Sequence, residues 1–206
     1  MPRRIRQHVN PLKLDYAVGC GARVALPPGR PVEVELGCAD ARFLFERAAV
    51  EPARFYVGVE IRAEMVAQVN RKARRLGDVP VLAVFANANI ELPALFAPAS
   101  VARFYVNFPD PWFKRRHHKR RVLTPELVTT LCDQLEPGGD LFFQSDVFDL
   151  ALDAMEVLEG AAPGLVNAAG PWRFTRPNPY GARSKRESTT ERRGKRVWRM
   201  SYRRPA

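Results

Sequence analysis

The residues best suited to chemistry in this chain are one aspartate and the strip of cations that follows it. Asp110 stands between Pro109 and Pro111. Each proline locks its own φ angle and pushes the preceding residue into an extended conformation, so the backbone around Asp110 is nearly fixed. Residues 114–121 hold six lysines or arginines and no acid. A rigid carboxylate beside enough cations to hold a polyphosphate predicts a site that does chemistry on a nucleic acid.

The distribution of charge supports this interpretation. The chain has 206 residues and a formal net charge of +11. Residues 1–13, 114–121 and 183–204 hold 20 of the 33 lysines and arginines but only two of the 22 acids, which leaves the rest of the chain with a net charge of −7. A single basic run is usually a solvated face or a tail, but three such runs on an acidic body favour phosphate binding.

Length and composition set milder limits. A chain of this size that is 46% hydrophobic can bury one core, so we expect a basic N-terminal extension at residues 1–30 and a single domain at 31–206 with a basic C-terminal segment. The three cysteines form no CxxC pair, which favours a reducing cytosol, and we expect no bound metal. No apolar run approaches the roughly 20 residues of a membrane span. We therefore expect a cytoplasmic protein without a membrane segment.

The elements that must position Asp110 follow from apolar runs that alternate with helical stretches, the pattern of a parallel sheet covered by helices. We predict strands at 32–36, 55–60, 81–85, 102–108, 141–144 and 198–202. Helices are predicted at 41–50, 63–76, 125–135 and 148–158, with a short helical or turn segment at 90–96. Thr124 reads as a helix cap before Pro125, and residues 137–139 (Pro-Gly-Gly) are expected to break that helix.

Polar groups end five of the predicted strands, and ligands of open α/β sheets bind beyond the carboxyl ends of the strands. These groups are Glu35 with Gly37, Glu60, Asn87, Asp110, and Ser145 with Asp146. Glu60 lies 23 residues after Gly37. An acid at about this distance from a glycine turn usually holds ribose hydroxyls, because a carboxylate accepts from two vicinal O–H groups. Each group alone could simply satisfy a loop; together they predict a ligand site.

These residues, in this order, resemble the tRNA (guanine-N7)-methyltransferases, which modify the variable loop of tRNA. The resemblance covers residues 33–202, and its most specific part is the sequence at 108–114 followed by 117–121. Residues 35–37 resemble the start of the family's cofactor loop, and Glu60 resembles its second-strand acid. Asn87 and Ala88 resemble the segment that faces the adenine, and residues 188–194 are similar to the C-terminal motif.

The resemblance implies a class I methyltransferase fold, an α/β, doubly wound, mostly parallel seven-stranded sheet of Rossmann-like type, that uses S-adenosylmethionine to methylate guanine N7 in tRNA. It implies cofactor contacts from Glu35, Gly37, Glu60, Asn87, Ala88 and Asp110. It implies nucleic-acid contacts from Lys114, Asp146, Ser188 and Glu191. We expect contacts to the RNA backbone from Arg115, Arg116, His118, Lys119, Arg120 and Arg121. A monomer and a chain that needs a partner subunit both stay open.

The chain departs from the family in its glycine-rich turn. Where the family has a GxGxG pattern, this chain has Gly37-Cys38-Ala39-Asp40-Ala41 and keeps only the first glycine. Alanine adopts a positive φ less readily than glycine, and Asp40 adds a negative charge near the expected methionine carboxylate. Either the loop takes a different path or the affinity for the cofactor is reduced.

Methylation of guanine N7 needs little from the protein beyond alignment. N7 presents an in-plane lone pair, so transfer from a sulfonium requires no general base. The product ring is cationic, and a nearby carboxylate would stabilise the developing charge. Asp110 is our first candidate for this role and Asp146 the second. His117 and His118 are interpreted as phosphate or backbone contacts, and Trp112 as either a stacking partner for a base or ordinary packing.

Two other classes of function stay open. A non-catalytic RNA-binding protein derived from this fold is suggested by the lost glycines, although Glu60, Asn87 and Asp110 argue against it; a titration with S-adenosylmethionine would separate the two. A methyltransferase acting on a small molecule or a protein would be insensitive to salt. A nicotinamide-dependent dehydrogenase is disfavoured, because no GxGxxG follows the first strand.

Overall fold

The computed structural model describes residues 9–12, 23–161 and 164–206, so most of the basic segment at 1–13, and Cys20, lie outside the described residues. Within these ranges, seven strands form one sheet in the order β3-β2-β1-β4-β5-β7-β6. The strands are β1 (Val32–Leu36), β2 (Phe55–Glu60), β3 (Val81–Phe85), β4 (Val101–Asn107), β5 (Leu135–Ser145), β6 (Val166–Asn167) and β7 (Trp198–Arg203). The first five run parallel, and β7 is antiparallel to both β5 and β6. This is the doubly wound, mostly parallel sheet that the resemblance implies.

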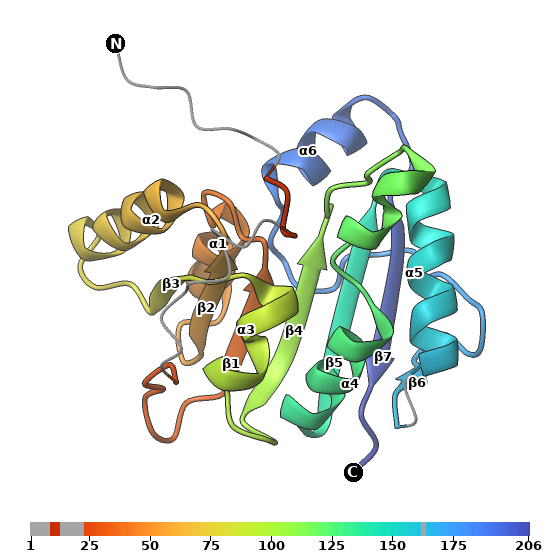
Figure 1. Cartoon of the computed structure of the whole chain (residues 1–206). Coiled ribbons are helices and arrows are strands. Elements are labelled where there is room, and N and C mark those ends of the chain that lie inside the picture. The colour runs from red at the N-terminus through yellow and green to blue at the C-terminus, as the bar shows by residue number, and fades with distance from the viewer. Residues whose placement is uncertain (1–8, 13–22, 162–163) are drawn as a thin grey trace.

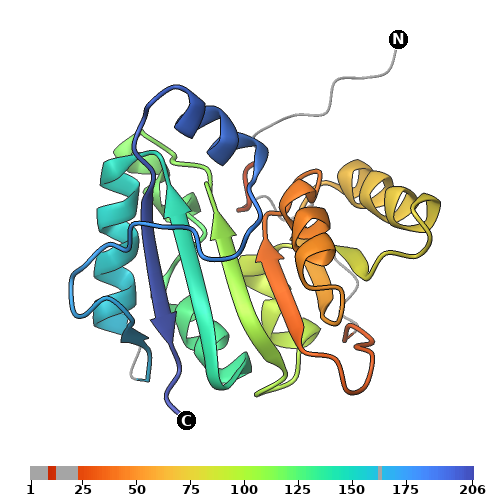
Figure 2. The ribbon, with the colours of Figure 1, turned by 180° about the vertical axis from the view of Figure 1, so that it is seen from behind.

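Helices cover both faces of the sheet. They are α1 (Arg42–Val50), α2 (Ala63–Arg75), α3 (Ala88–Leu95), α4 (Pro125–Gln134), α5 (Phe148–Ala161) and α6 (Lys185–Arg192), with a 3₁₀ helix η2 (Arg115–Arg120). Figure 1 looks onto the face covered by α3, α4 and α5, and Figure 2 onto the face covered by α1. Helix α6 covers neither face; it lies beyond the tips of the strand arrows of β4 and β5 (Figure 2).

Each face has its own core. Leu92, Leu131 and Leu158 belong to the cluster between the sheet and α3, α4 and α5, and Phe43 and Val69 to the cluster under α1 and α2. All five residues of β1 are buried, as expected for a parallel strand covered on both sides. None of the helices in the described ranges combines the length and the apolar character needed to cross a bilayer.

The predicted bounds of β1, β2 and β3 match the structure, and the Thr124 side chain caps α4 by accepting from Leu127 N, with Pro125 in the first helical turn. Residues 137–139 follow the end of α4 at Gln134, as expected, but the prediction for β5 was too short because the strand already begins at Leu135. They lie within a strand whose pairing with β4 shifts register between Val101 and Arg103, and Gly138 takes a positive φ of 79° there. Helices α6 and η2 and strand β6 were not predicted.

The start of the domain is also more closely attached than a free extension would be. Val24 N donates to Leu95 O over 2.9 Å, and Val24 and Leu26 pack against the core cluster under α3, α4 and α5. Residues shortly before position 30 therefore contact the sheet domain, and the division of the chain at residue 30 stays a prediction.

Candidate functional site

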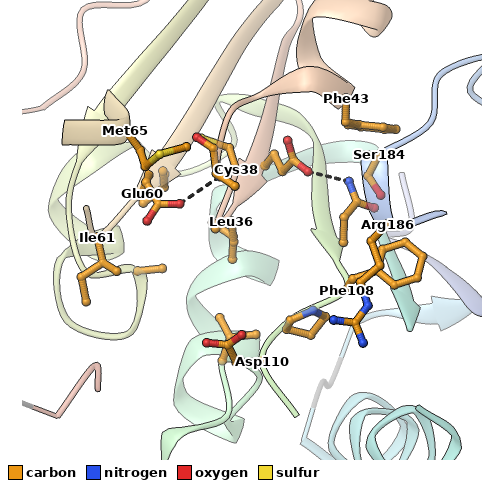
Figure 3. Close-up of a pocket in the computed structure, with 18 of the residues that line it drawn as sticks. Leu36, Cys38, Phe43, Glu60, Ile61, Met65, Phe108, Asp110, Ser184 and Arg186 are labelled. Carbon is orange, nitrogen blue, oxygen red and sulfur yellow. Dashed lines mark hydrogen bonds between the residues drawn. The ribbon is translucent and has the colours of Figure 1, made fainter. Parts of the chain in front are cut away.

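A cleft of about 830 Å³ opens at the carboxyl ends of the parallel strands. This volume lies within the range of small-molecule sites. Its walls include Glu35 from β1, Glu60 from β2, Asn107 from β4 and the loop that carries Asp110, and α6 closes one side (Figure 3). The predicted residues Gly37, Asn87, Ala88 and Asp146 line the same cleft. The fold thus brings together all six residues expected to contact the cofactor and one of the four expected on the nucleic-acid side.

The loop after β1 has positive φ angles at two positions that are occupied by alanine rather than glycine. Gly37, Ala39 and Ala41 have φ angles of 74°, 51° and 50°. For alanine this left-handed region costs about 1–2 kcal/mol per residue. The surroundings hold it: Ala39 N donates to Glu60 Oε2 over 2.9 Å, and Ala41 is fully buried. The loop therefore has left-handed backbone at three alternate positions. Alanine at two of these positions has not removed the positive φ angles that glycine would favour.

Glu60 already has a cationic partner. Its carboxylate accepts from Arg62 Nε and Nη2, both over 2.8 Å, and from the backbone N of Arg62 over 3.1 Å. The hydrogen bonds to Glu60 raise the pKa of Arg62, and Asp110 adds to this effect through its charge. Arg62 lines the cleft and was not singled out in the sequence, although it follows Glu60 by two residues. Any ligand group that binds Glu60 must share this carboxylate with Arg62.

Glu35 is the most deeply desolvated acid of the cleft. Its Oε1 accepts from Asn107 Nδ2 over 2.8 Å, and its buried Oε2 has no hydrogen-bond partner. Burial raises the pKa of Glu35 to about 8, and the negative charges of Asp40 and Glu60 act in the same direction. Glu35 is therefore mostly protonated at neutral pH. An unsatisfied buried oxygen on the wall of a cleft is an unused hydrogen-bonding position for a ligand.

The wall after β3 is built by the start of α3. Asn87 caps this helix by accepting from Asn89 N over 3.2 Å, and Asn87 N donates to Glu91 Oε2 over 2.7 Å. Its Nδ2 donates to Pro11 O over 2.6 Å, and Pro11 lines the cleft beside Ala88. The short described segment at 9–12 thus contributes to this end of the cleft.

Helix α6 carries the other end of the cleft. Asp146 accepts from Arg186 Nε over 3.1 Å at each oxygen and is also paired with Arg186 Nη2 over 2.9 Å. Lys185, Thr189, Thr190 and Arg193 line the same wall. We did not predict this helix, because every residue from 185 to 192 is polar and no apolar stripe marks a buried side. The signal that could have found it is Ser184, whose side chain caps the helix by accepting from Glu187 N.

Three residues expected on the nucleic-acid side are not among the described residues that line the cleft. Ser188 Oγ donates along the helix to Ser184 O over 3.1 Å. Glu191 accepts from Arg199 Nη2 over 2.7 Å and from Arg183 Nε over 2.9 Å. Lys114 is exposed and precedes η2. Contacts from these three to a nucleic acid would therefore be made outside the cleft.

The cation strip at residues 114–121 divides into three parts. Arg115, Arg116 and Lys119 are exposed on η2, whereas the Arg120 guanidinium lies 5.0 Å from the Trp112 ring centroid and both side chains line the cleft. His118 and Arg121 lie instead in an adjacent pocket of about 180 Å³, where Arg121 is paired with Asp153. In the described ranges, no group of three or more His, Cys, Asp or Glu side chains is arranged to hold a metal ion.

Comparison with known proteins gives concordant matches. Residues 29–200 match a family model described as "Putative methyltransferase". A tRNA (guanine-N(7)-)-methyltransferase of Thermosynechococcus vestitus is 36% identical over 212 residues, which cover 98% of this chain and 96% of that protein. Another, from a Synechocystis species, is 39% identical over 190 residues, 89% of each protein. The crystal structure of the 16S rRNA methyltransferase KamB shares the fold, with a TM-score of 0.60 and 17% identity over 85% of this chain and 88% of that one.

Proposed function

Because this chain belongs to the tRNA (guanine-N7)-methyltransferase family, we propose that it transfers a methyl group from S-adenosylmethionine to guanine N7 in tRNA, in the cytoplasm. One observation supports this most directly. The same cleft is lined by Glu35, Glu60 and Asp110 and by the basic residues of α6, so a small cationic cofactor and a phosphate-bearing substrate would meet in it.

The residues present fit the cofactor. S-adenosylmethionine supplies a methyl group on a positively charged sulfur. Glu60 at the end of β2 would accept from the two ribose hydroxyls alongside Arg62, and Oε2 of Glu35 would accept from a ligand ammonium once Glu35 has released its proton. Asn87 and Ala88 would contact the adenine from the start of α3.

The chain's own part in the reaction is alignment and electrostatics. Guanine N7 attacks with its in-plane lone pair, so no side chain has to remove a proton, and holding the base in line accounts for most of the rate. We assign Asp110 to the purine ring, where its negative charge would stabilise the positive charge that develops on methylation. Asp146 is our second choice, because the Arg186 guanidinium already offsets its charge.

The tRNA would lie across α6 and η2. Lys185, Arg186 and Arg193 line the cleft, and the exposed η2 cations Arg115, Arg116 and Lys119 extend the basic surface beside it. Such side chains position a nucleic acid through its phosphates. We propose that Lys114, Ser188 and Glu191 contact tRNA beyond the rim of the cleft.

The test is methylation of unmodified tRNA by the purified protein, with the nucleosides analysed by mass spectrometry for 7-methylguanosine. Asp110→Asn keeps the shape of the side chain and removes its charge, so we expect kcat to fall at least a hundredfold, roughly 2.7 kcal/mol of barrier. Asp133→Asn changes an exposed acid on α4 and serves as the matched control. A folded Asp110→Asn enzyme within threefold of wild type would remove Asp110 from the site, and a folded wild type that forms no 7-methylguanosine would reject the function.

A further inference from the structure

A line of buried polar side chains leads from the cofactor end of the cleft to helix α6. Asn107 ends β4 and donates from Nδ2 to Glu35 Oε1 over 2.8 Å. Its Oδ1 accepts from Gln144 Nε2 over 2.9 Å, and the same Nε2 donates to Glu187 Oε2 of α6 over 3.0 Å. Asn107 and Gln144 are cross-strand partners in the register of β4 and β5. Gln144 is fully buried, whereas Asn107 is half-buried and lines the cleft.

Arg199 of β7 completes the line. Its Nε donates to Gln144 Oε1 over 3.1 Å, and its Nη2 donates to Glu187 Oε1 over 2.8 Å and to Glu191 Oε1 over 2.7 Å. Hydrogen bonds therefore run without interruption from Glu35 on β1 to Glu191 on α6, across the adjacent strands β4, β5 and β7. Both N–H groups of the Gln144 amide donate and its oxygen accepts, which fixes the direction of its dipole.

Helix α6 is held in place by hydrogen bonds and ion pairs, and these bonds are among them. Its two buried residues are Glu187 and Thr190, both polar, so no apolar side chain of α6 anchors it in the core. A helix held mainly through hydrogen bonds moves when the geometry of those bonds changes. In a low-dielectric interior, hydrogen bonds in a chain polarise one another, so a new partner for Glu35 alters the Asn107 and Gln144 bonds as well.

We propose that Asn107 and Gln144 are positioning residues which couple occupation of the cofactor site at Glu35 to the placement of α6 against tRNA. The inference rests on the proposed function for the identity of the two ligands. Neither residue belongs to the motifs that suggested the site. Because coupling between two binding sites is reciprocal, the factor by which cofactor raises tRNA affinity equals the factor by which tRNA raises cofactor affinity.

The first test follows α6 directly and needs no tRNA. Hydrogen exchange of the amides of residues 185–192 is measured with and without S-adenosylhomocysteine. We expect the ligand to slow exchange in the wild type and to have no effect on α6 in Gln144→Met, while the Kd of the ligand changes less than threefold. Gln134→Met is the matched control, because Gln134 is also buried and donates to Leu92 O and Phe96 O, remote from α6. Equal slowing in wild type and Gln144→Met would overturn the proposal.

The second test measures the coupling factor. The Kd of tRNA is determined with and without S-adenosylhomocysteine, and the ratio should exceed fivefold in wild type and Gln134→Met but lie near one in Gln144→Met. Asn107→Leu breaks the line of hydrogen bonds at its other end, and it too should give a ratio near one. It replaces Gln144→Met in the test if that variant folds poorly. A wild-type ratio near one would overturn the coupling. Failure of the wild type to bind S-adenosylhomocysteine at all would instead refute the proposed function, and the inference with it.

Discussion

The carboxyl group of Glu35 makes the stability of the protein depend on pH. Burial raises its pKa from 4.5 to about 8, so between these values the folded state holds a proton that the unfolded chain releases. Stability must then fall as pH rises through this window, by at most about 1.4 kcal/mol per pH unit. The direction is opposite to that of an acid stabilised by an ion pair.

Replacing Glu35 by glutamine should remove this dependence. Glutamine is close in shape to the protonated acid and keeps an oxygen for Asn107 Nδ2. We expect Glu35→Gln to be close to wild type in stability near pH 4.5 and increasingly more stable than it toward pH 8, measured by urea unfolding of the ligand-free protein. Glu156→Gln, an exposed acid on α5, is the control. Parallel pH profiles for wild type and Glu35→Gln would show that Glu35 ionises normally.

The cofactor loop stores strain that a single substitution can release. Ala39 has a φ of 51°, which costs alanine about 1–2 kcal/mol, while glycine adds flexibility to the unfolded chain worth about 0.4–1 kcal/mol. We expect Ala39→Gly to stabilise the protein by roughly 0.5–1 kcal/mol, seen as a higher urea midpoint. Affinity for S-adenosylhomocysteine should stay within threefold, because the loop has the same conformation before and after the change.

The control for this element is Ala53→Gly. Ala53 is exposed and does not have a positive φ, so glycine there should only lower stability. If Ala39→Gly also lowers stability, the left-handed backbone of the loop is not strained.

The sequence predicted the elements that are determined by their own residues rather than by contacts with distant parts of the chain. Strands β2 and β3 are short and largely apolar, β1 alternates apolar residues with glutamates, and Thr124 with Pro125 marks the start of α4 by local chemistry. Helix α6 has a local start signal in Ser184, which caps it, but no apolar stripe, because its buried side consists of Glu187 and Thr190, which are satisfied by distant partners. The carboxylates of the site were predicted from their place at strand ends, whereas Asn107 and Gln144 required the register between β4 and β5.

Acidic and basic residues lie in different parts of the molecule. The acidic body holds the sheet, and the cations gather on α6 and η2 at the carboxyl end of the strands, where Lys185 and Arg193 line the cleft. A protein arranged in this way binds a polyanion by releasing its counterions, so the logarithm of tRNA affinity falls linearly with the logarithm of salt concentration.

The double variant Lys185→Gln and Arg193→Gln should reduce that salt slope by about 1.5, because each lost phosphate contact contributes roughly 0.7–0.9. Binding of S-adenosylhomocysteine should not change. The matched control replaces Arg71 and Arg75, two exposed cations on α2, by glutamine and should leave the slope unaltered. An unchanged slope in the α6 variant would place the tRNA elsewhere on the surface.

The position of β7 has a consequence for how the protein is made. This strand comes last of the seven in the sequence but lies inside the sheet, between β5 and β6, and it brings Arg199 to Glu187 and Glu191. On the ribosome, the loop of Asp110 and the cations of η2 emerge long before the guanidinium that fixes α6. A nascent or prematurely terminated chain therefore carries basic residues able to attract RNA while the edge of β5 stays open and two carboxylates of α6 lack Arg199. Once β7 has been translated, Arg199 can bind both carboxylates, and α6 then takes its place beside the cleft.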